Sequence, residues 1–168
     1  MNAGAYGRSI GELIEWVEIV DMEGKLVRLD VRDIHFGYRE ADFPVRGVLS
    51  RVGFRLAFGS SDESFDRIKT YNEKRRASQP WGARTFGSTF RNPRNGEKAA
   101  RLMDQAGLKG AREGDAFFSE KHANFMINAG QATSKDALRL IARAREGVRS
   151  MAGLELALEV KMWGVFDA

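Results

Sequence analysis

Hydrophobic and polar residues alternate along the first third of the chain in the manner of β-strands. The segment 14–20 (IEWVEIV) has this pattern, a turn follows at 21–24, and 25–29 (KLVRL) returns as the second arm of a hairpin. The segment 48–58 alternates for longer and predicts a half-buried strand. It places five apolar side chains largely on one face: Val48, Val52, Phe54, Leu56 and Phe58.

Three helices are predicted in the rest of the chain. A capping-box spacing starts the first at Ser60, and we expect this helix to run to about Arg76. The short amphipathic segment 97–106 predicts the second. The third is capped by 133–136 (TSKD), has apolar residues at helical spacing and ends at Gly153.

Between and after these helices the pattern is extended or irregular. Residues 79–95 are rich in Gly, Pro, Ser and Asn and predict a long loop, and long ordered loops are often functional. The segment 125–128 (FMIN) predicts a short strand, and 154–163 alternates as a last strand. Strands followed by a mixed helix–strand region predict an α+β fold with two domains, 1–59 and 60–168.

The composition excludes several kinds of chemistry. The 168 residues include no cysteine, which excludes disulfides and thiolate catalysis, and the two histidines, His35 and His122, are too few for a histidine-rich metal site. We therefore predict no metal. No apolar run approaches the ~20 residues that span a bilayer, and no secretory signal is visible. A cytoplasmic protein without a membrane partner is expected.

The positive charge has two interpretations. The net charge of +4 and the pI near 9.6 would suit a nucleic acid, but basic and acidic residues are interleaved along most of the chain. The densest basic run, 74–76, ends a predicted helix, where the helix dipole favours cations. An anionic small molecule suits a modest positive excess equally well. We expect no nucleic-acid partner.

Polar residues in two segments can bind or transfer protons, although each also has an ordinary structural explanation. Arg39 follows a Gly-Tyr step and can present a planar fork to a carboxylate or phosphate. In the predicted loop, Ser88 offers a hydroxyl group and Asn92 an amide that donates and accepts. No G-x-S-x-G motif is present, so serine hydrolase chemistry has little support.

Two further polar positions lie in predicted strands or directly before them. His122 and Asn124 alternate with apolar neighbours, which predicts that both project to the polar face. A histidine in such a place is more often a satisfied hydrogen-bonding group than a catalyst. Glu159 lies in the predicted last strand, where a carboxylate is usually part of the solvent-facing side.

The order and spacing of these segments are more specific than any one of them. Six motifs follow one another along the chain: MNAGAYG at 1–7, FGYR at 36–39, GSTFRNP at 87–93, AGLKG at 106–110, SEKHANF at 119–125 and LEVKMWG at 158–164. Together they resemble the C-terminal part of the UDP-N-acetylenolpyruvoylglucosamine reductase family. The direct run from Phe43 to the strand at Val48 resembles the subtype without an insertion there.

The resemblance implies both a fold and a reaction. Residues 1–59 would be the C-terminal remnant of a vanillyl-alcohol-oxidase-type FAD-binding domain, and 60–168 a small α/β substrate-binding domain. The reaction would be that of a UDP-N-acetylmuramate dehydrogenase of peptidoglycan synthesis. In it, NADPH reduces FAD, and FAD reduces UDP-N-acetylglucosamine enolpyruvate.

The resemblance also assigns roles to residues. Ser88 matches the proton donor of the family, and Arg39 and Glu159 match its other two catalytic residues, which act on the substrate carboxylate. To help an anion, Glu159 would need to carry a proton or to act through a partner group. Positions that contact substrate fall on Asn92, His122 and Tyr38. Positions that line the flavin fall on Asn2, Gly4, Ala5, Tyr6 and Gly7.

The sequence departs from the family pattern in several places. Ala41 replaces a common serine beside the flavin and Leu158 a common proline, and the family often has a lysine near Ser78 for the substrate diphosphate. The G-I-P-G-x-x-G-G segment that precedes MNAGAYG in the family is not in this chain, and Met1 corresponds to an internal methionine. We expect a misplaced start, a split gene or a fragment. A separate chain is one possible source of the missing N-terminal part of the FAD-binding domain. The alternative is a non-catalytic nucleotide-sugar-binding remnant.

Overall fold

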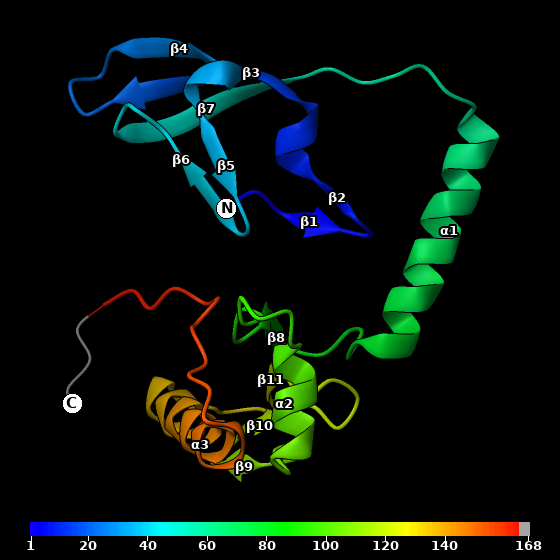
Figure 1. Cartoon of the computed structure of the whole chain (residues 1–168), viewed down its shortest axis with the longest axis vertical. Coiled ribbons are helices and arrows are strands. Elements are labelled where there is room, and N and C mark those ends of the chain that lie inside the picture. The colour runs from blue at the N-terminus through cyan, green and yellow to red at the C-terminus, as the bar shows by residue number, and fades with distance from the viewer. Residues whose placement is uncertain (165–168) are drawn as a thin grey trace. The chain divides into compact units, whose positions relative to one another are not determined.

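The computed structural model describes residues 1–164. They divide into two compact units, Met1–Ser61 and the described residues from Asp62 onward. Each unit has its own cluster of buried apolar side chains. Helices and strands together give a mixed α and β architecture (Figure 1).

A three-stranded antiparallel sheet is the centre of the first unit, with the order β4-β3-β7 (Figure 1). Its strands are β3 (Ile14–Asp21), β4 (Leu26–Asp30) and β7 (Gly47–Phe54). The predicted hairpin of β3 and β4 is confirmed. The unit also has two small hairpins, which the alternation did not predict, and two 3-10 turns. These are β1 (Gly4–Ala5) with β2 (Arg8–Ser9), β5 (His35–Gly37) with β6 (Glu40–Asp42), and the turns Ile10–Leu13 and Val31–Asp33.

The two faces of this sheet differ in chemistry. The core side of the unit buries Val17, Ile19, Leu29 and Ile34, and each such apolar side chain contributes about 1.5–3 kcal/mol on burial. On the other face, Glu18 is buried between two cross-strand arginines. Its carboxylate lies 3.9 Å from Arg28 and 3.5 Å from Arg51. These two cations compensate a charge that would otherwise be costly to bury.

The prediction for 48–58 was wrong in two respects. The strand ends at Phe54, and the N–H of the next residue, Arg55, donates to the carbonyl of Leu13 in the turn before β3. Part of the predicted apolar face is exposed, since Val48 is 71% and Leu56 69% exposed, whereas Val52 packs on the core of the unit. The pairing of β7 with β3 shifts register between Leu49 and Arg51, so strict alternation does not hold along the segment.

The second unit combines a four-stranded sheet with helices. The strand order is β8-β11-β10-β9, and all neighbours are antiparallel. The strands are β8 (Thr85–Ser88), β9 (Arg112–Glu113), β10 (Ala116–Phe118) and β11 (Phe125–Asn128). The helices are α1 (Ser61–Ser78), α2 (Ala99–Gln105) and α3 (Ser134–Ala152). The predicted strand at 125–128 and all three predicted helices are confirmed, with small shifts of their ends.

Helix α3 shows why its prediction succeeded. Thr133 accepts from the backbone N–H of Asp136, whose side chain accepts from the N–H of Thr133, so the predicted capping box is present. Gly153 ends the helix with a φ of 66°, a left-handed conformation that favours glycine. One face of α3 buries Leu140 and Ala144 against a core that includes Phe118 of β10.

Two predictions in this unit were wrong. The expected loop 79–95 contains β8, which has no apolar alternation and is paired through β11. The expected last strand, 154–163, is not a strand: Leu158 forms one isolated β-bridge with Phe90. Its alternation instead reflects burial, because Leu154, Leu156 and Leu158 pack on the core.

Candidate functional site

Ser88 is the last residue of β8 and pairs with Phe125, the first residue of β11. Its side chain is half-buried. The glycine before it, Gly87, has a φ of 86° and open space where a Cβ would lie. A ligand can therefore approach the backbone closely beside the Ser88 hydroxyl.

Backbone hydrogen bonds place Glu159 beside Thr89, the residue that follows Ser88. The N–H of Glu159 donates to the carbonyl of Thr89 at 2.9 Å, and the N–H of Arg91 donates to the carbonyl of Ala157 at 2.8 Å. The Glu159 side chain is half-buried. The structure thus places two of the predicted catalytic residues, far apart in the sequence, on adjoining segments of one unit.

His122 lies in the turn that leads into β11. Its backbone carbonyl accepts from Phe125, and its ring meets the Phe125 ring edge-on at 4.7 Å between centroids. Burial of the ring, together with the charge of Lys109, lowers the pKa of His122 below its ordinary value. The imidazole is therefore neutral at pH 7. The Nδ1 atom is buried and has no hydrogen-bond partner among residues 1–164.

The expectation that Asn124 projects to a polar face was wrong. Asn124 is 4% exposed. The reason is that 122–125 form a turn, in which Phe125 N–H bonds to the carbonyl of His122, so strand parity does not extend back from β11. The sequence places Asn124 in a motif but gives no signal that its side chain is internal.

Asn92 lies in the segment after β8, and its side chain bonds to the first residue of α2. Its Oδ1 accepts from the backbone N–H of Ala99 at 3.0 Å. This bond satisfies one of the donors that a helix start leaves open. The Nδ2 group is the part of Asn92 that can donate to a ligand.

The remaining predicted residues belong to the first unit. The Arg39 guanidinium donates to the carbonyl of Gly4 at 3.3 Å and lies 5.4 Å from the centre of the Tyr38 ring. A predicted catalytic residue is thus tied to the predicted flavin-lining segment. Asn2 fixes the same region, because its amide donates to the carbonyl of Gly37 and accepts from the N–H of Gly11.

Backbone strain gathers at these positions. Among the described residues, three other than glycine have positive φ: Asn2 at 43°, Tyr6 at 52° and Arg39 at 60°. This conformation costs about 1–2 kcal/mol for an L-residue, and retained strain of this kind clusters at functional sites. All three are among the residues singled out from the sequence.

The segment 2–7 is compatible with a flavin. A Cβ at Gly4 would lie 3.1 Å from the Arg8 carbonyl oxygen and 3.6 Å from the Arg39 guanidinium, which favours glycine there. Gly7 has no heavy atom within 4 Å of such a Cβ, and Ala5 and Tyr6 are exposed. A flat ring can reach the backbone of this turn without displacing a side chain.

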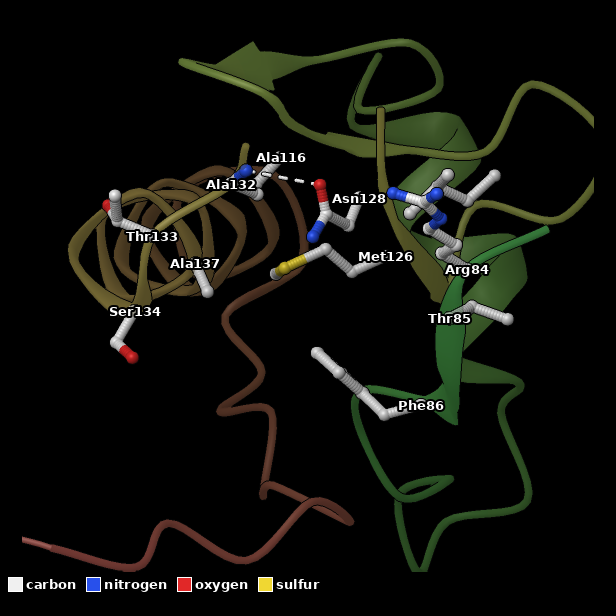
Figure 2. Close-up of a pocket in the computed structure, with 11 residues that line it drawn as sticks. Arg84, Thr85, Phe86, Ala116, Met126, Asn128, Ala132, Thr133, Ser134 and Ala137 are labelled. Atoms are coloured by element: carbon white, nitrogen blue, oxygen red, sulfur yellow. Dashed lines mark hydrogen bonds between the residues drawn. The ribbon is translucent and has the colours of Figure 1, made fainter. Parts of the chain in front are cut away.

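A cavity of about 490 Å³ lies in the second unit apart from Ser88 and Glu159. Figure 2 shows Arg84 and Thr85 on one side of it and Thr133 and Ser134, at the start of α3, on the other. Asn128 lies between them, and its Oδ1 accepts from the N–H of Ala132 at 3.1 Å. Its lining includes none of the predicted site residues.

Two other searches covered the described residues. No group of three His, Asp or Glu side chains in residues 1–164 could hold a metal ion. No helix in that range combines the length and the apolar composition needed to cross a membrane.

Comparison with known proteins adds to this geometry. The model of the "UDP-N-acetylenolpyruvoylglucosamine reductase, C-terminal domain" family matches residues 79–163, about half of the chain. The chain belongs to this reductase family. The match includes Ser88, Asn92, His122 and Glu159. The predicted resemblance is confirmed.

Relatives of the family match almost the whole chain. UDP-N-acetylenolpyruvoylglucosamine reductase from Gluconobacter oxydans is 44% identical over 98% of this chain and 53% of its own length. The reductase from Chloroherpeton thalassium is 45% identical over 98% and 55%. The crystal structure of the reductase from Thermus caldophilus matches with a TM-score of 0.85 and 34% identity, covering 98% of this chain and 58% of that one.

The chain spans about half the length of the curated relatives that it matches. Its similarity therefore shows membership of an oxidoreductase family and a mixed α and β fold like that of the family. The activity, substrate and cofactors of the whole reductase are matters for proposal.

Proposed function

We propose that this chain carries the substrate-binding domain and part of the FAD-binding domain of a UDP-N-acetylmuramate dehydrogenase. Residues 1–59 would belong to the flavin domain and 60–168 to the substrate domain. The enzyme would reduce UDP-N-acetylglucosamine enolpyruvate in the cytoplasm, in peptidoglycan synthesis, with NADPH as co-substrate. The hydrogen bond from the Glu159 N–H to the Thr89 carbonyl carries the proposal, because it places Glu159 beside the residue that follows Ser88.

The reaction requires a hydride on the terminal carbon of the enolpyruvyl group and a proton on its C2. Bound FAD would supply the hydride. Ser88 donates the proton, since a hydroxyl beside a strongly basic carbanion can transfer it. Arg39 stabilises the negative charge that develops on the substrate carboxylate. Glu159 acts on the same carboxylate as a protonated acid or through a partner group.

The remaining residues bind and orient. Asn92 donates through Nδ2, because its Oδ1 is bonded to Ala99. His122 contacts the nucleotide sugar as a neutral imidazole, and Tyr38 lies beside Arg39 in the first unit. The flavin would lie along Asn2 and 4–7, where exposed backbone and glycine leave room for it.

A second candidate function is nucleotide-sugar binding without catalysis. It is favoured by the placement of Ser88, Asn92 and His122 in a unit that has its own hydrophobic core. That unit holds its site residues through its own strands and helices. Binding by the second unit therefore does not depend on flavin in the first.

The test uses the 168-residue chain. Calorimetry measures affinity for UDP-N-acetylglucosamine enolpyruvate, and visible absorbance after addition of FAD and removal of the excess measures flavin. Turnover is followed as loss of NADPH. The assay is run with and without a second chain, which is the part of the Gluconobacter oxydans relative that this chain does not match. We expect binding of the UDP-sugar, retention of flavin, and turnover when the second chain is present.

The matched variants are Asn92→Asp and Asn95→Asp. Asn92→Asp keeps the acceptor for Ala99 but removes the donor, so affinity for the UDP-sugar falls about tenfold or more. Asn95→Asp adds the same charge in the same loop, where Oδ1 accepts from Glu97 N–H, and leaves affinity near that of the original. Binding without flavin or turnover supports the second candidate. Absence of UDP-sugar binding contradicts both.

A further inference from the structure

Asn124 holds the chain immediately after Ser88 by its side chain. Its Oδ1 accepts from the backbone N–H of Phe90 at 2.9 Å, and its Nδ2 donates to the carbonyl of Phe90 at 2.8 Å. Its own backbone carbonyl accepts from the N–H of Thr89 at 2.8 Å. All three groups are buried, since Asn124, Thr89 and Phe90 are at most 4% exposed.

This contact replaces regular strand pairing at the point where the site residues meet. Strand β8 ends at Ser88, and Phe90 makes an isolated bridge with Leu158 instead of a ladder. The segment that carries Glu159 is bonded to Thr89 and Arg91, on either side of Phe90. The segment 89–91 therefore sets the position of the Glu159 backbone. Asn124 in turn holds the segment 89–91 through its bonds to Thr89 and Phe90.

We propose that Asn124 is a positioning residue that sets Glu159 relative to Ser88. The significance for catalysis rests on the function proposed above, although the positioning itself does not. An amide is suited to the task because it donates and accepts at once, as the two backbone groups of Phe90 require. A carboxylate at the same place accepts but cannot donate, and it would face the carbonyl of Phe90.

The chain offers a matched control in Asn128. This residue lies at the other end of β11, and its Oδ1 accepts from the N–H of Gly130 at 2.8 Å. It also accepts from the N–H of Ala132 at 3.1 Å (Figure 2). It thus makes two side-chain bonds to backbone, as Asn124 does. Both of these bonds go to the segment before α3, and neither involves the segments that carry Ser88 and Glu159.

The experiment measures amide hydrogen exchange by NMR in the 168-residue chain. In Asn124→Ala, the amides of Thr89, Arg91 and Glu159 lose protection by about tenfold or more, while amides of α3 around Leu140 keep theirs. In Asn128→Ala the first three amides keep their protection. Equal losses in α3, or the same loss in Asn128→Ala, would overturn the proposal.

Asn124→Asp adds a test that a merely structural role would not pass. A protonated carboxylic acid donates and accepts like the amide, whereas the ionised form cannot donate. After correction for intrinsic exchange, protection of the Glu159 amide is therefore near the original at low pH. It falls as pH rises and the introduced carboxyl group ionises, with α3 unaffected. A pH-independent ratio to the original chain would overturn the proposal.

A functional measurement separates this proposal from the preceding one. With turnover established, Asn124→Ala lowers kcat about tenfold or more and changes KM little, because Asn124 orders the catalytic groups without contacting substrate. Equal effects on KM and kcat contradict the positioning role. If the original chain shows no turnover or UDP-sugar binding, the function proposal fails, and the exchange data still decide whether Asn124 positions Glu159.

Discussion

The backbone N–H of Glu159 donates to the carbonyl of Thr89 at 2.9 Å. This bond places Glu159 beside Thr89, the residue that follows Ser88, although the segment around Glu159 is not a strand. Because the bond belongs to the backbone, the Glu159 side chain can be changed while its position is kept. Ser88 and Glu159 can therefore be substituted one at a time.

Replacement of Glu159 by Gln tests the proposed chemistry. Gln has nearly the same shape and keeps the backbone bond, but it cannot act as an acid. We expect turnover to fall by about 100-fold or more, with UDP-sugar affinity and unfolding unchanged. Steady-state NADPH consumption and calorimetry measure the two effects. Glu155→Gln, at an exposed ion pair with Arg149, is the control and should keep full turnover; an equal loss there would refute a specific role for Glu159.

Gly47 offers a steric test of the first unit. A Cβ at this position would lie 2.1 Å from the carbonyl oxygen of Val20, which is backbone and cannot rotate away. We expect Gly47→Ala to destabilise the pairing of β3 with β7 by about 1–3 kcal/mol. Urea unfolding followed through amide resonances of β3 measures this loss. Gly59→Ala, where a Cβ meets no described atom within 4 Å, should leave the midpoint unchanged.

Thr133 tests the cap of α3. Its hydroxyl accepts from the N–H of Asp136 at 3.2 Å and donates to the carboxylate of Asp136 at 2.8 Å. The backbone N–H of Thr133, and after it the hydroxyl, donate to the Asp136 carboxylate and hold the pKa of Asp136 below its ordinary value. Thr133→Ala should cost about 1 kcal/mol of unfolding free energy in the second unit. Thr133→Ser retains the hydroxyl and should lose much less; similar losses for the two variants would contradict the capping role.

His122 makes the stability of the second unit depend on pH. Because burial lowers its pKa in the folded state, the unfolded chain binds the proton more tightly. Above the ordinary value of 6.5 the imidazole is neutral in both states, and the contribution is fully present. As pH falls below 6.5, the unfolded state gains protons first and stability is lost.

The measurement for His122 compares the original chain with His122→Gln in urea at about pH 7.5 and about pH 5.5, on either side of the ordinary imidazole value. The original chain should lose more unfolding free energy between these two pH values than the variant does. Parallel losses in the two proteins would show that the imbalance in proton binding does not come from His122.

Sequence patterns predicted the elements that carry their own local signals. The hairpin of β3 and β4 has alternation and a turn, and α3 has a capping box and a terminal glycine. The pattern failed where side chains alternate in burial but the backbone is not paired as a strand. Leu154, Leu156 and Leu158 alternate because they pack on a core, although their backbone makes one isolated bridge within the described residues.

The site was only partly predictable for the same reason. Ser88 and Glu159 were named from motifs, but their association depends on bonds from Thr89 and Asn124 that no local pattern encodes. Asn124 was assigned to a polar face, because strand parity was extended through what is a turn. The roles of the site residues stay predictions until the variants are measured.

The exposed apolar residues of β7 have a consequence for sample handling. This strand is at the edge of its sheet in the described structure, and Val48, Leu49 and Phe54 are 71%, 47% and 46% exposed. An apolar strand edge is a template for pairing with a second chain, and an exposed patch of this kind favours self-association. Concentrated samples of this polypeptide should therefore scatter light and precipitate sooner than its net charge of +4 suggests.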